Sequence, residues 1–554
     1  MRNLCVLILI AGLLAPAFAT GAREEAATGI REYDIFLGYE KPDYPTDGTI
    51  FGDWLEEQTG VRINWEFNVG DLQQKVGLIA ASGDYPDAIH PRNYTQILLS
   101  AGAAIPLNDL IESHGPNLKE IYGDRMEMFR QPDGNIYWFP QVMPYGDEYR
   151  TPNPGHGVWV QKAVLDYFDY PLPNTLEEMV DMLIEYAKAH PTIDGNKTYA
   201  WTGLFWTWRE FPVFNAPTIL SGHPNDAAVS VDWVDGRWKA RAFYDQEESY
   251  RIYKLYNKMH LEGLYDTESF VMDYDQYLAK LSGGSILAFY DQDWQFGTVQ
   301  NLLLDQDQDR WWVALPLAME GYDPEIMNPP QPQVSEGITI STQARDPEGL
   351  MEYFNFLAKW DTIRMREWGR EGVDYMVDSN GLFFRTPEQV SQWRNQDWVR
   401  TTYGADYWVN FIRLDGGSLY PDGLNNIAPG NQPSVFQAAL RPQQLDVLQG
   451  YGVDTFAQIF QERHPQPDMR RSTYFPAWTI TMPPDSPESI TGTRIGDVRR
   501  RYIPQLIMAP AGQYDRIWND FIAEINQIPQ RERDAHTAFI QREIDRRVEA
   551  AGGY

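Results

Sequence analysis

The chain has 554 residues, of which 43% are hydrophobic and 14% aromatic, and its formal net charge is −32. A chain of this length exceeds what one hydrophobic core usually supports, so we expect two or more lobes. The negative charge argues against nucleic acid and anionic membrane surfaces as partners, because both select basic patches. It also disfavours polyanionic ligands, which a local arginine cluster could overcome, so neutral ligands fit best.

The N-terminus predicts export. Arg2 precedes an apolar run over 4–14, and Ala17 and Ala19 fit the small-residue pattern of a signal-peptidase site. The run is shorter than the ~20 residues that span a bilayer. We therefore expect residues 1–19 to be a signal peptide, residues 20–29 to be a polar spacer, and the processed protein to work in the periplasm or outside the cell without inserting into a membrane.

Cys5, the single cysteine, lies inside the apolar run. Cleavage after Ala19 would remove it, which excludes disulfides, thiolate metal sites and cysteine nucleophiles from the mature chain. A bacterial lipoprotein needs a cysteine just after the apolar run, where Thr20 and Gly21 stand instead. We therefore expect a protein that is not lipid-anchored.

Strands and helices alternate in the first part of the chain. The apolar patterns predict strands over 33–38, 61–69 and 88–89, and helices over 50–59 and 72–81. This β-α-β-α-β order implies a parallel, doubly wound sheet, and therefore an α/β fold. Such sheets bind ligands at the C-terminal ends of their strands.

The clearest elements predicted in the rest of the chain are helices. They are predicted over 175–189, 250–262, 348–360, 513–525 and 531–550. Asn174 or Thr175 caps the first of these, and Asp346 and Pro347 precede the third. The most linker-like stretch is 328–333, where we expect a hinge crossing.

Catalytic and metal motifs are absent from the sequence. It has no P-loop, no dinucleotide glycine fingerprint, no H-E-x-x-H and no G-x-S-x-G. Asp305, Asp307 and Asp309 share the start of an EF-hand loop, but Arg310 and Pro316 stand where that loop needs Gly and Glu. We interpret this stretch as a solvated acidic turn, and we predict no metal site, no cofactor and no catalytic residue.

Two aromatic segments are more informative. Trp206 and Trp208 would point to the same side if their segment is extended. The segment 288–294 combines aromatic rings with Asp291 and Asp293. Sugars present apolar C–H faces flanked by hydroxyls, so flat rings beside carboxylates suit them. The alternative is that these rings fill a core.

Four segments, in order along the chain, carry a resemblance to a known family. They are 82–88 (SGDYPDA), 133–140 (DGNIYWFP), 159–165 (WVQKAVL) with 173–178 (PNTLEE), and 368–375 (WGREGVDY). With these motifs the chain resembles the extracellular solute-binding proteins of carbohydrate ABC importers, in particular their long oligosaccharide-binding branch. The resemblance implies a two-lobed periplasmic-binding-protein type II fold with discontinuous lobes, a hinge, and a ligand held in the cleft.

The resemblance also implies domain boundaries. The N-terminal lobe would comprise 30–148 and 330–362, and the C-terminal lobe 149–329 and 363–554. The chain would cross between them near Met143–Gly155 and again near Asn328–Glu336.

Candidate ligand-binding residues follow from the same resemblance. The segment 284–294 matches the family segment that supplies a sugar-stacking ring, which makes Trp294 the first candidate, with Asp291 and Asp293 beside it. Further candidates are Trp206, Trp208, Arg209 and Trp478, and also Arg92, Asn93 and Tyr94, which come just after the third strand. Long relatives often carry a calcium loop after the helix over 175–189. Here only Asp194 and Asn196 remain as ligands, so we predict no calcium there.

The functional expectation is a monomeric binding protein, not an enzyme, that captures a carbohydrate and delivers it to the permease subunits of an ABC importer. One alternative is a secreted glycan-degrading enzyme, which needs two carboxylates at a defined separation across a cleft. Another is a peptide- or lipid-binding receptor on the same architecture, whose cleft would be lined by backbone-contacting groups or aliphatic side chains.

Overall fold

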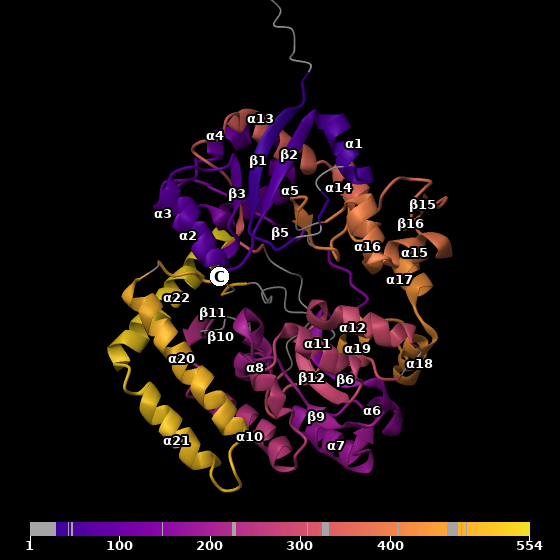
Figure 1. The fold of residues 1–554 in the computed structure, drawn as a ribbon, viewed down its shortest axis with the longest axis vertical. Coiled ribbons are helices and arrows are strands. Elements are labelled where there is room, and N and C mark those ends of the chain that lie inside the picture. Colours follow the sequence, from indigo (N-terminus) through magenta and orange to yellow (C-terminus); the bar gives the residue numbers. More distant parts are fainter. Residues whose placement is uncertain are drawn as a thin grey trace, which may run out of the picture.

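The computed structural model describes residues 29–553, apart from 42–43, 46–47, 147, 224–228, 307–308, 324–331, 407–408, 462–474, 478 and 484. The expected signal peptide, nearly all of the spacer, and Trp478 lie outside the described residues. The described chain forms two α/β lobes, one above the other (Figure 1). We call them the N lobe and the C lobe. None of the described helices is both long and apolar enough to cross a membrane.

The N lobe is built on a five-stranded sheet in the order β2-β1-β3-β14-β4. Its strands are β1 (Arg31–Leu37), β2 (Val61–Phe67), β3 (Ala88–His90), β4 (Phe139–Pro140) and β14 (Gly337–Ile340). β1 pairs in parallel with β2 and β3, while β14 pairs antiparallel with β3 and β4. The predicted parallel sheet is therefore confirmed for its first three strands.

Helices pack around this sheet (Figure 1). They are α1 (Ile50–Thr59), α2 (Leu72–Ser82), α3 (Thr95–Ser100), α4 (Asn108–His114), α5 (Pro116–Tyr122), α13 (Pro347–Leu357) and α14 (Trp360–Glu367). Local capping sets their ends: the Thr49 side chain accepts a hydrogen bond from the Gly52 amide, and Gly60 ends α1 in the left-handed conformation. Asp346 caps α13 and Pro347 occupies its first turn, as predicted.

The C lobe has a four-stranded sheet in the order β13-β6-β12-β9. Its strands are β6 (His156–Gln161), β9 (Tyr199–Trp201), β12 (Ile286–Gln292) and β13 (Trp312–Leu315). Its helices are α6 (Lys162–Tyr167), α7 (Leu176–Ala189), α8 (Phe211–Phe214), α9 (Ala216–Ile219), α10 (Glu247–Leu261), α11 (Tyr274–Ser282), α12 (Asp293–Asp305), α18 (Pro442–Tyr451), α19 (Phe456–Gln461), α20 (Pro487–Ile507) and α21 (Tyr514–Ile525). Thr175 caps α7 through its hydroxyl, which accepts from the Glu178 amide.

The chain passes between the lobes more than once. β4 belongs to the N-lobe sheet and β6 to the C-lobe sheet, so one crossing lies between Pro140 and His156. β13 and β14 likewise belong to different sheets, which places a second crossing between Leu315 and Gly337. Part of this second stretch lies outside the described residues.

The expected boundary at residue 363 is wrong for much of the segment that follows. Trp368, Tyr403, Ile412 and Ile427 are buried in the core of the N lobe rather than that of the C lobe. Contacts far apart in sequence explain this, because Tyr403 packs its ring against Phe51 of α1. This segment contains β15 (Met376–Val377), β16 (Phe383–Phe384), α15 (Pro387–Arg394), α16 (Gln396–Trp398), β17 (Arg413–Leu414) and α17 (Pro433–Ala439). β17 pairs in parallel with β5 (Val142–Met143).

The last helix, α22 (Gln530–Ala550), contacts both lobes (Figure 1). The His536 Nδ1–H donates to the Glu488 carbonyl in the first turn of α20, while Ile540 and Ile544 are buried in the N-lobe core. The second half of the helix is thus a further exception to the expected C-terminal lobe. An apolar helix face predicts burial but does not indicate which lobe buries it. The sequence pattern therefore could not assign the second half of α22 to the N-lobe core.

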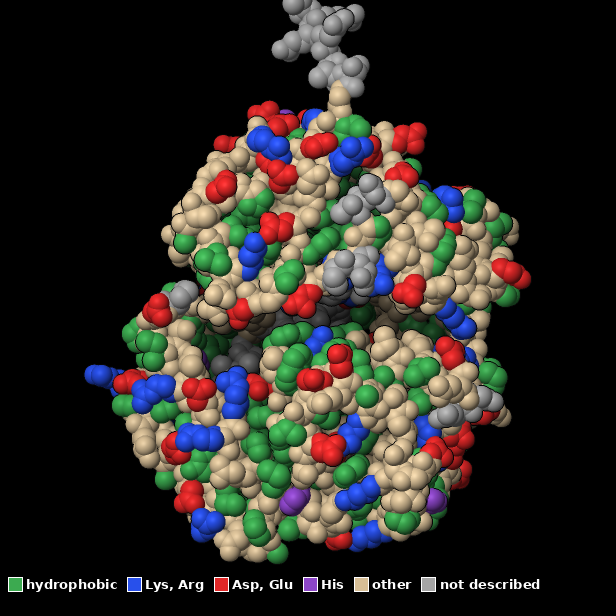
Figure 2. Space-filling view, viewed as in Figure 1, with side chains coloured by type: hydrophobic (Ala, Val, Ile, Leu, Met, Phe, Trp, Pro, Cys, Tyr) green, Lys and Arg blue, Asp and Glu red, His purple; other side chains and the backbone are tan. Residues whose placement is uncertain are grey.

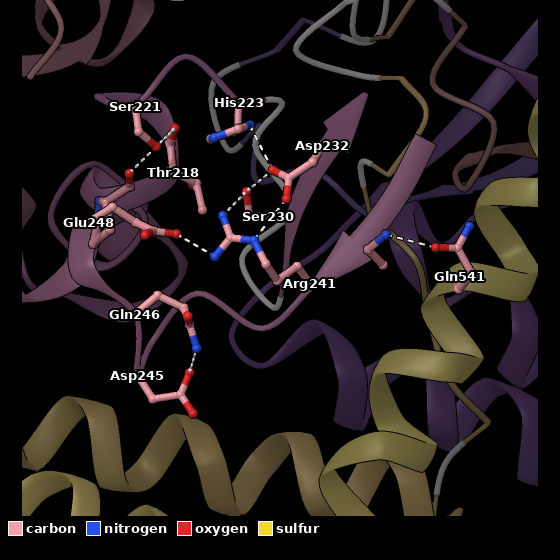
Figure 3. A network of polar contacts seen from close by, with 12 residues as sticks. Thr218, Ser221, His223, Ser230, Asp232, Arg241, Asp245, Gln246, Glu248 and Gln541 are labelled. Atoms are coloured by element: carbon pink, nitrogen blue, oxygen red, sulfur yellow. Dashed lines mark hydrogen bonds and ion pairs between the residues drawn. The ribbon is translucent and has the colours of Figure 1, made fainter. Parts of the chain in front are cut away.

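A polar network secures the hairpin of β10 (Ser230–Val234) and β11 (Arg237–Arg241) (Figure 3). Arg241 donates to Asp232 over 2.8 Å and to Glu248 of α10 over 2.7 Å. Gln541 of α22 accepts from the Ala240 amide over 2.7 Å. Arg241 thus joins the hairpin to α10, and Gln541 joins it to α22.

A candidate ligand site in the cleft between the lobes

The boundary between the lobes is hollowed into a recess (Figure 2). On the N-lobe side, Tyr39 and Arg92 follow the C-terminal ends of the parallel strands β1 and β3, where such sheets place their ligands. On the C-lobe side stand the 3₁₀ helix η3 (Thr207–Glu210) and the first turn of α12. The Arg92 guanidinium carbon lies 5.9 Å from the Trp208 ring centroid, so the two lobes meet here.

Trp208 and Trp294 form an aromatic platform on the C-lobe side. Their rings are stacked, with centroids 5.8 Å apart and planes 20° apart, and Phe211 stacks on Trp294 at 6.2 Å. Trp208 is 54% exposed and Trp294 50% exposed, whereas Trp201 and Trp312 of the same lobe are buried. These two tryptophans therefore present ring surface to the cleft instead of filling the core.

The segment that carries Trp206 and Trp208 is not extended. Trp206 precedes η3 and Trp208 lies within it, so the condition under which the two rings would share one side of a strand is not met. Thr207 between them has φ of 49°, and Arg92 across the cleft has φ of 52°. Such left-handed backbone is costly for side chains other than Gly, Asn or Asp, and it concentrates at functional sites.

Arg209 lies among the aromatic rings. Its guanidinium carbon is 4.4 Å from the Trp208 centroid and 3.8 Å from that of Tyr274. It donates a hydrogen bond of 2.6 Å to Gln295 Oε1. Burial lowers the pKa of Arg209 and the charge of Arg92 lowers it further, whereas Tyr274 and Asp291 raise it. The predicted Arg209 therefore lies beside the aromatic platform, held in place by Gln295.

Asp291 lies beneath this arrangement at the end of β12. It is 1% exposed and accepts hydrogen bonds from the Tyr277 hydroxyl, the Gln295 amide and the Gln292 backbone, each 2.8 Å long. Burial raises the pKa of Asp291 to about 7, against the lowering effect of these donors. Contrary to expectation, Asp291 does not face the cleft; it accepts from Gln295, which in turn accepts from Arg209.

Asp293 begins α12 and remains accessible to solvent. Protein nevertheless surrounds it from both sides of the cleft, and this loss of water raises its pKa to about 6. The Trp294 amide and the charge of Arg413 lower the pKa, whereas Asp415 raises it. Asp293 is thus the one predicted carboxylate that stands in the cleft.

The N-lobe wall contains residues that the sequence did not point to. The Arg92 guanidinium carbon lies 4.8 Å from the Tyr39 ring, and its Nε is 3.6 Å from the buried carboxylate of Glu336. The Tyr39 hydroxyl donates to Gln141 over 3.0 Å. Tyr39 follows the first strand directly, so the strand-end rule could have found it. Nothing in the local sequence marks Glu336 or Arg413.

Two predicted residues lie apart from the platform. Tyr94 packs against the small cluster beneath α2 and α3, which contains Phe36 and Val76. Asn93 belongs to the same short 3₁₀ turn and is half-buried. Of the residues after β3, only Arg92 contacts the aromatic platform.

The loop suspected of a degenerate calcium site is a tight hairpin. β7 (Thr192–Ile193) pairs with β8 (Asn196–Lys197), and Asp194 and Gly195 form the turn with positive φ. Over the described parts of the chain, no group of three His, Cys, Asp or Glu side chains is placed to hold a metal ion.

Two α/β lobes with an aromatic and charged site between them define a two-lobed binding protein. A family model of the bacterial extracellular solute-binding proteins matches residues 41–359, more than half of the chain. The chain belongs to this family.

Similar proteins are known in sequence and in structure. The fructooligosaccharide ABC transporter substrate-binding protein FusA of Streptococcus pneumoniae serotype 4 is 28% identical over 246 residues, which span 41% of this chain and 43% of that relative. A structure of an EF-hand mutant of S. pneumoniae FusA with fructo-nystose has a TM-score of 0.64 at 19% identity, and the match covers 93% of this chain and 99% of that one. An extracellular solute-binding protein from Bifidobacterium longum subsp. infantis has a TM-score of 0.66 at 17% identity, covering 94% and 99%. These structures share the two-lobed fold.

Proposed function

We propose that this chain is the extracytoplasmic substrate-binding protein of an ABC importer. It captures a carbohydrate, in our proposal an oligosaccharide, in the interlobe cleft and delivers it to the permease subunits. The exposed stacked pair of Trp208 and Trp294 carries this proposal, because ring faces of this kind bind the apolar C–H faces of sugars. Family membership supports export to the periplasm or beyond.

The polar groups beside the platform suit hydroxyl recognition. Arg209 and Asp293 stand next to the rings from the C lobe, and Arg92 approaches from the N lobe. A hydrogen bond between a charged group and a neutral hydroxyl is stronger than a hydrogen bond between two neutral groups. Among the comparisons, FusA is described as binding fructooligosaccharides, which agrees with a carbohydrate as the class of ligand.

The positions of the carboxylates in the site favour binding over hydrolysis. A glycosidase needs two carboxyl groups that both reach the scissile bond. Of the two carboxylates predicted from the sequence, Asp291 is buried and accepts from three donors, which leaves Asp293 beside the platform. We therefore propose a monomeric binding protein without catalytic activity.

The test is a thermal-shift screen of the purified protein against oligosaccharides of varied composition and length. A ligand present at 100 times its Kd adds about 2.7 kcal/mol of stability, which raises the Tm measurably. The Trp208→Ala/Trp294→Ala double variant should lose the shift, and Tyr167→Ala, which alters an exposed ring on α6, should keep it. The absence of a shift across the panel would contradict the proposal. Product release, followed by chromatography, would favour the enzyme.

A further inference from the structure

Two arginines from opposite lobes approach the same indole ring. Arg92 comes from the turn after β3 and Arg209 from η3, and their guanidinium carbons lie 5.9 Å and 4.4 Å from the Trp208 centroid. The charge of Arg92 disfavours the charged form of Arg209, as expected for two cations within electrostatic range of each other. Such repulsion is stronger in a protein cleft than in bulk water because the effective dielectric constant is lower.

The two arginines differ in whether an anion lies next to them. Arg92 has Glu336 at 3.6 Å. Arg209, in contrast, forms no ion pair within the described part of the chain: its hydrogen bond goes to the neutral amide of Gln295, and its faces contact rings. A half-buried cation without a paired anion retains part of its desolvation penalty, and a nearby negative charge would offset it.

The nearby carboxylates supply only part of that charge: the charge of Asp291 raises the pKa of Arg209, but the two groups form no ion pair. Asp291 lies on the far side of Gln295, and its oxygens already accept hydrogen bonds from three donors. Because burial raises its pKa to about 7, it is also partly protonated at neutral pH. Asp293 interacts with Arg413, a different cation. The position beside Arg209 and facing Arg92 is therefore suited to an anion from outside the chain.

We propose that the ligand is an acidic carbohydrate whose anionic group, a carboxylate or a sulfate ester, binds between Arg92 and Arg209 at the edge of the Trp208 ring. The proposal rests on the proposed function and specifies its substrate class. Guanidinium groups bind such oxyanions through paired hydrogen bonds. An anion here would also remove the repulsion between the two arginines, and so favour closure of the lobes.

The net charge of −32 does not oppose this site. Charges further away than the Debye length, about 8 Å at physiological ionic strength, are largely screened. The arginines at the platform are within reach of the ligand, whereas most of the surface carboxylates are not. The local charge therefore decides the class of ligand bound.

The test is isothermal titration of the whole protein with trisaccharides matched in length. The probes are trigalacturonate for the carboxylate, a sulfated galactan trisaccharide for the sulfate ester, and maltotriose, cellotriose and 1-kestose as neutral sugars. We expect one acidic probe to bind at least about tenfold more tightly than every neutral one, and its affinity to fall with added NaCl. Whichever acidic probe binds identifies the anionic group.

Variants then locate the anion. Arg209→Gln should reduce the ratio of acidic to neutral affinity by about tenfold or more, and Arg209→Lys should reduce it less, since it keeps the charge but not the paired donors. Arg516→Gln, at an exposed arginine of α21, should leave the ratio unchanged. Neutral sugars binding while both acidic probes fail would overturn this inference and leave the proposed function standing. An acidic preference that survives Arg209→Gln would overturn the assignment to this site, and no binding of any sugar would overturn both proposals.

Discussion

The guanidinium carbon of Arg92 lies 5.9 Å from the ring centroid of Trp208, and the two residues belong to different lobes. A cation this close to an indole face is attracted by about 0.5–2 kcal/mol. Because the contact needs both lobes, it exists only while the cleft is closed at this point. It therefore links the ring that we propose to stack on sugar to the hinge motion that two-lobed binding proteins undergo.

Loss of this contact should open the ligand-free protein. In Trp208→Ala, the attraction across the cleft disappears and the open form gains population, so the radius of gyration in small-angle X-ray scattering should increase. Tyr167→Ala removes an exposed ring far from the cleft and should give the wild-type curve. An unchanged radius of gyration in Trp208→Ala would show that other contacts hold the lobes together.

The platform should dominate ligand affinity. Trp294→Ala removes a ring that is half exposed, so we expect little change in Tm but a loss of affinity of about 10- to 100-fold, which corresponds to about 1.4–2.8 kcal/mol. Titration calorimetry with the ligand found in the screen measures this. A similar loss in Trp206→Ala would mean that the platform extends beyond the stacked pair.

Asp291 should make stability depend on pH. Below about pH 4 its carboxyl is protonated in both the folded and the unfolded states. Between about pH 4 and the folded pKa of about 7, the folded protein holds a proton that the unfolded chain has released. The free energy of unfolding should therefore decrease as the pH rises through this range, by up to about 1.4 kcal/mol per pH unit.

Asp291→Asn should remove this component. The amide keeps an acceptor for Gln295 and carries no charge, so the difference in unfolding free energy between variant and wild type should shift in favour of the variant from pH 4 to pH 7. Urea unfolding at several pH values measures it, with Asp520→Asn on the exposed face of α21 as the control. A difference that does not change with pH would mean that Asp291 is ionised throughout.

The network around Arg241 should matter for stability rather than for binding. Arg241→Met would leave Glu248, whose side chain is 6% exposed, without its partner (Figure 3). Because breaking a buried ion pair leaves an uncompensated charge, we expect a loss of about 2–3 kcal/mol in the free energy of unfolding. Arg251→Met breaks a more exposed pair with Glu177 and should cost about 1 kcal/mol or less. Equal losses in the two variants would show that Glu248 is not isolated by the change.

Features decided within a few residues could be predicted from the sequence. The helix expected over 50–59 has these bounds in the structure, and Thr175 caps α7 as expected. Apolar periodicity, caps and turns act between near neighbours, so the sequence alone determined the parallel order of the first three strands. The motif that ends at Trp294 also singled out a ring that the structure stacks on Trp208.

The tertiary structure alone decided which residues meet. Trp208 faces Arg92 only because two lobes close on each other, and Asp293 meets Arg413 only because β17 returns to the N lobe. Burial of Asp291 depends on how α11 and α12 pack over β12, through Tyr277 and Gln295. Contacts between residues hundreds of positions apart follow from the packing of whole lobes, and local sequence preferences carry no information about them.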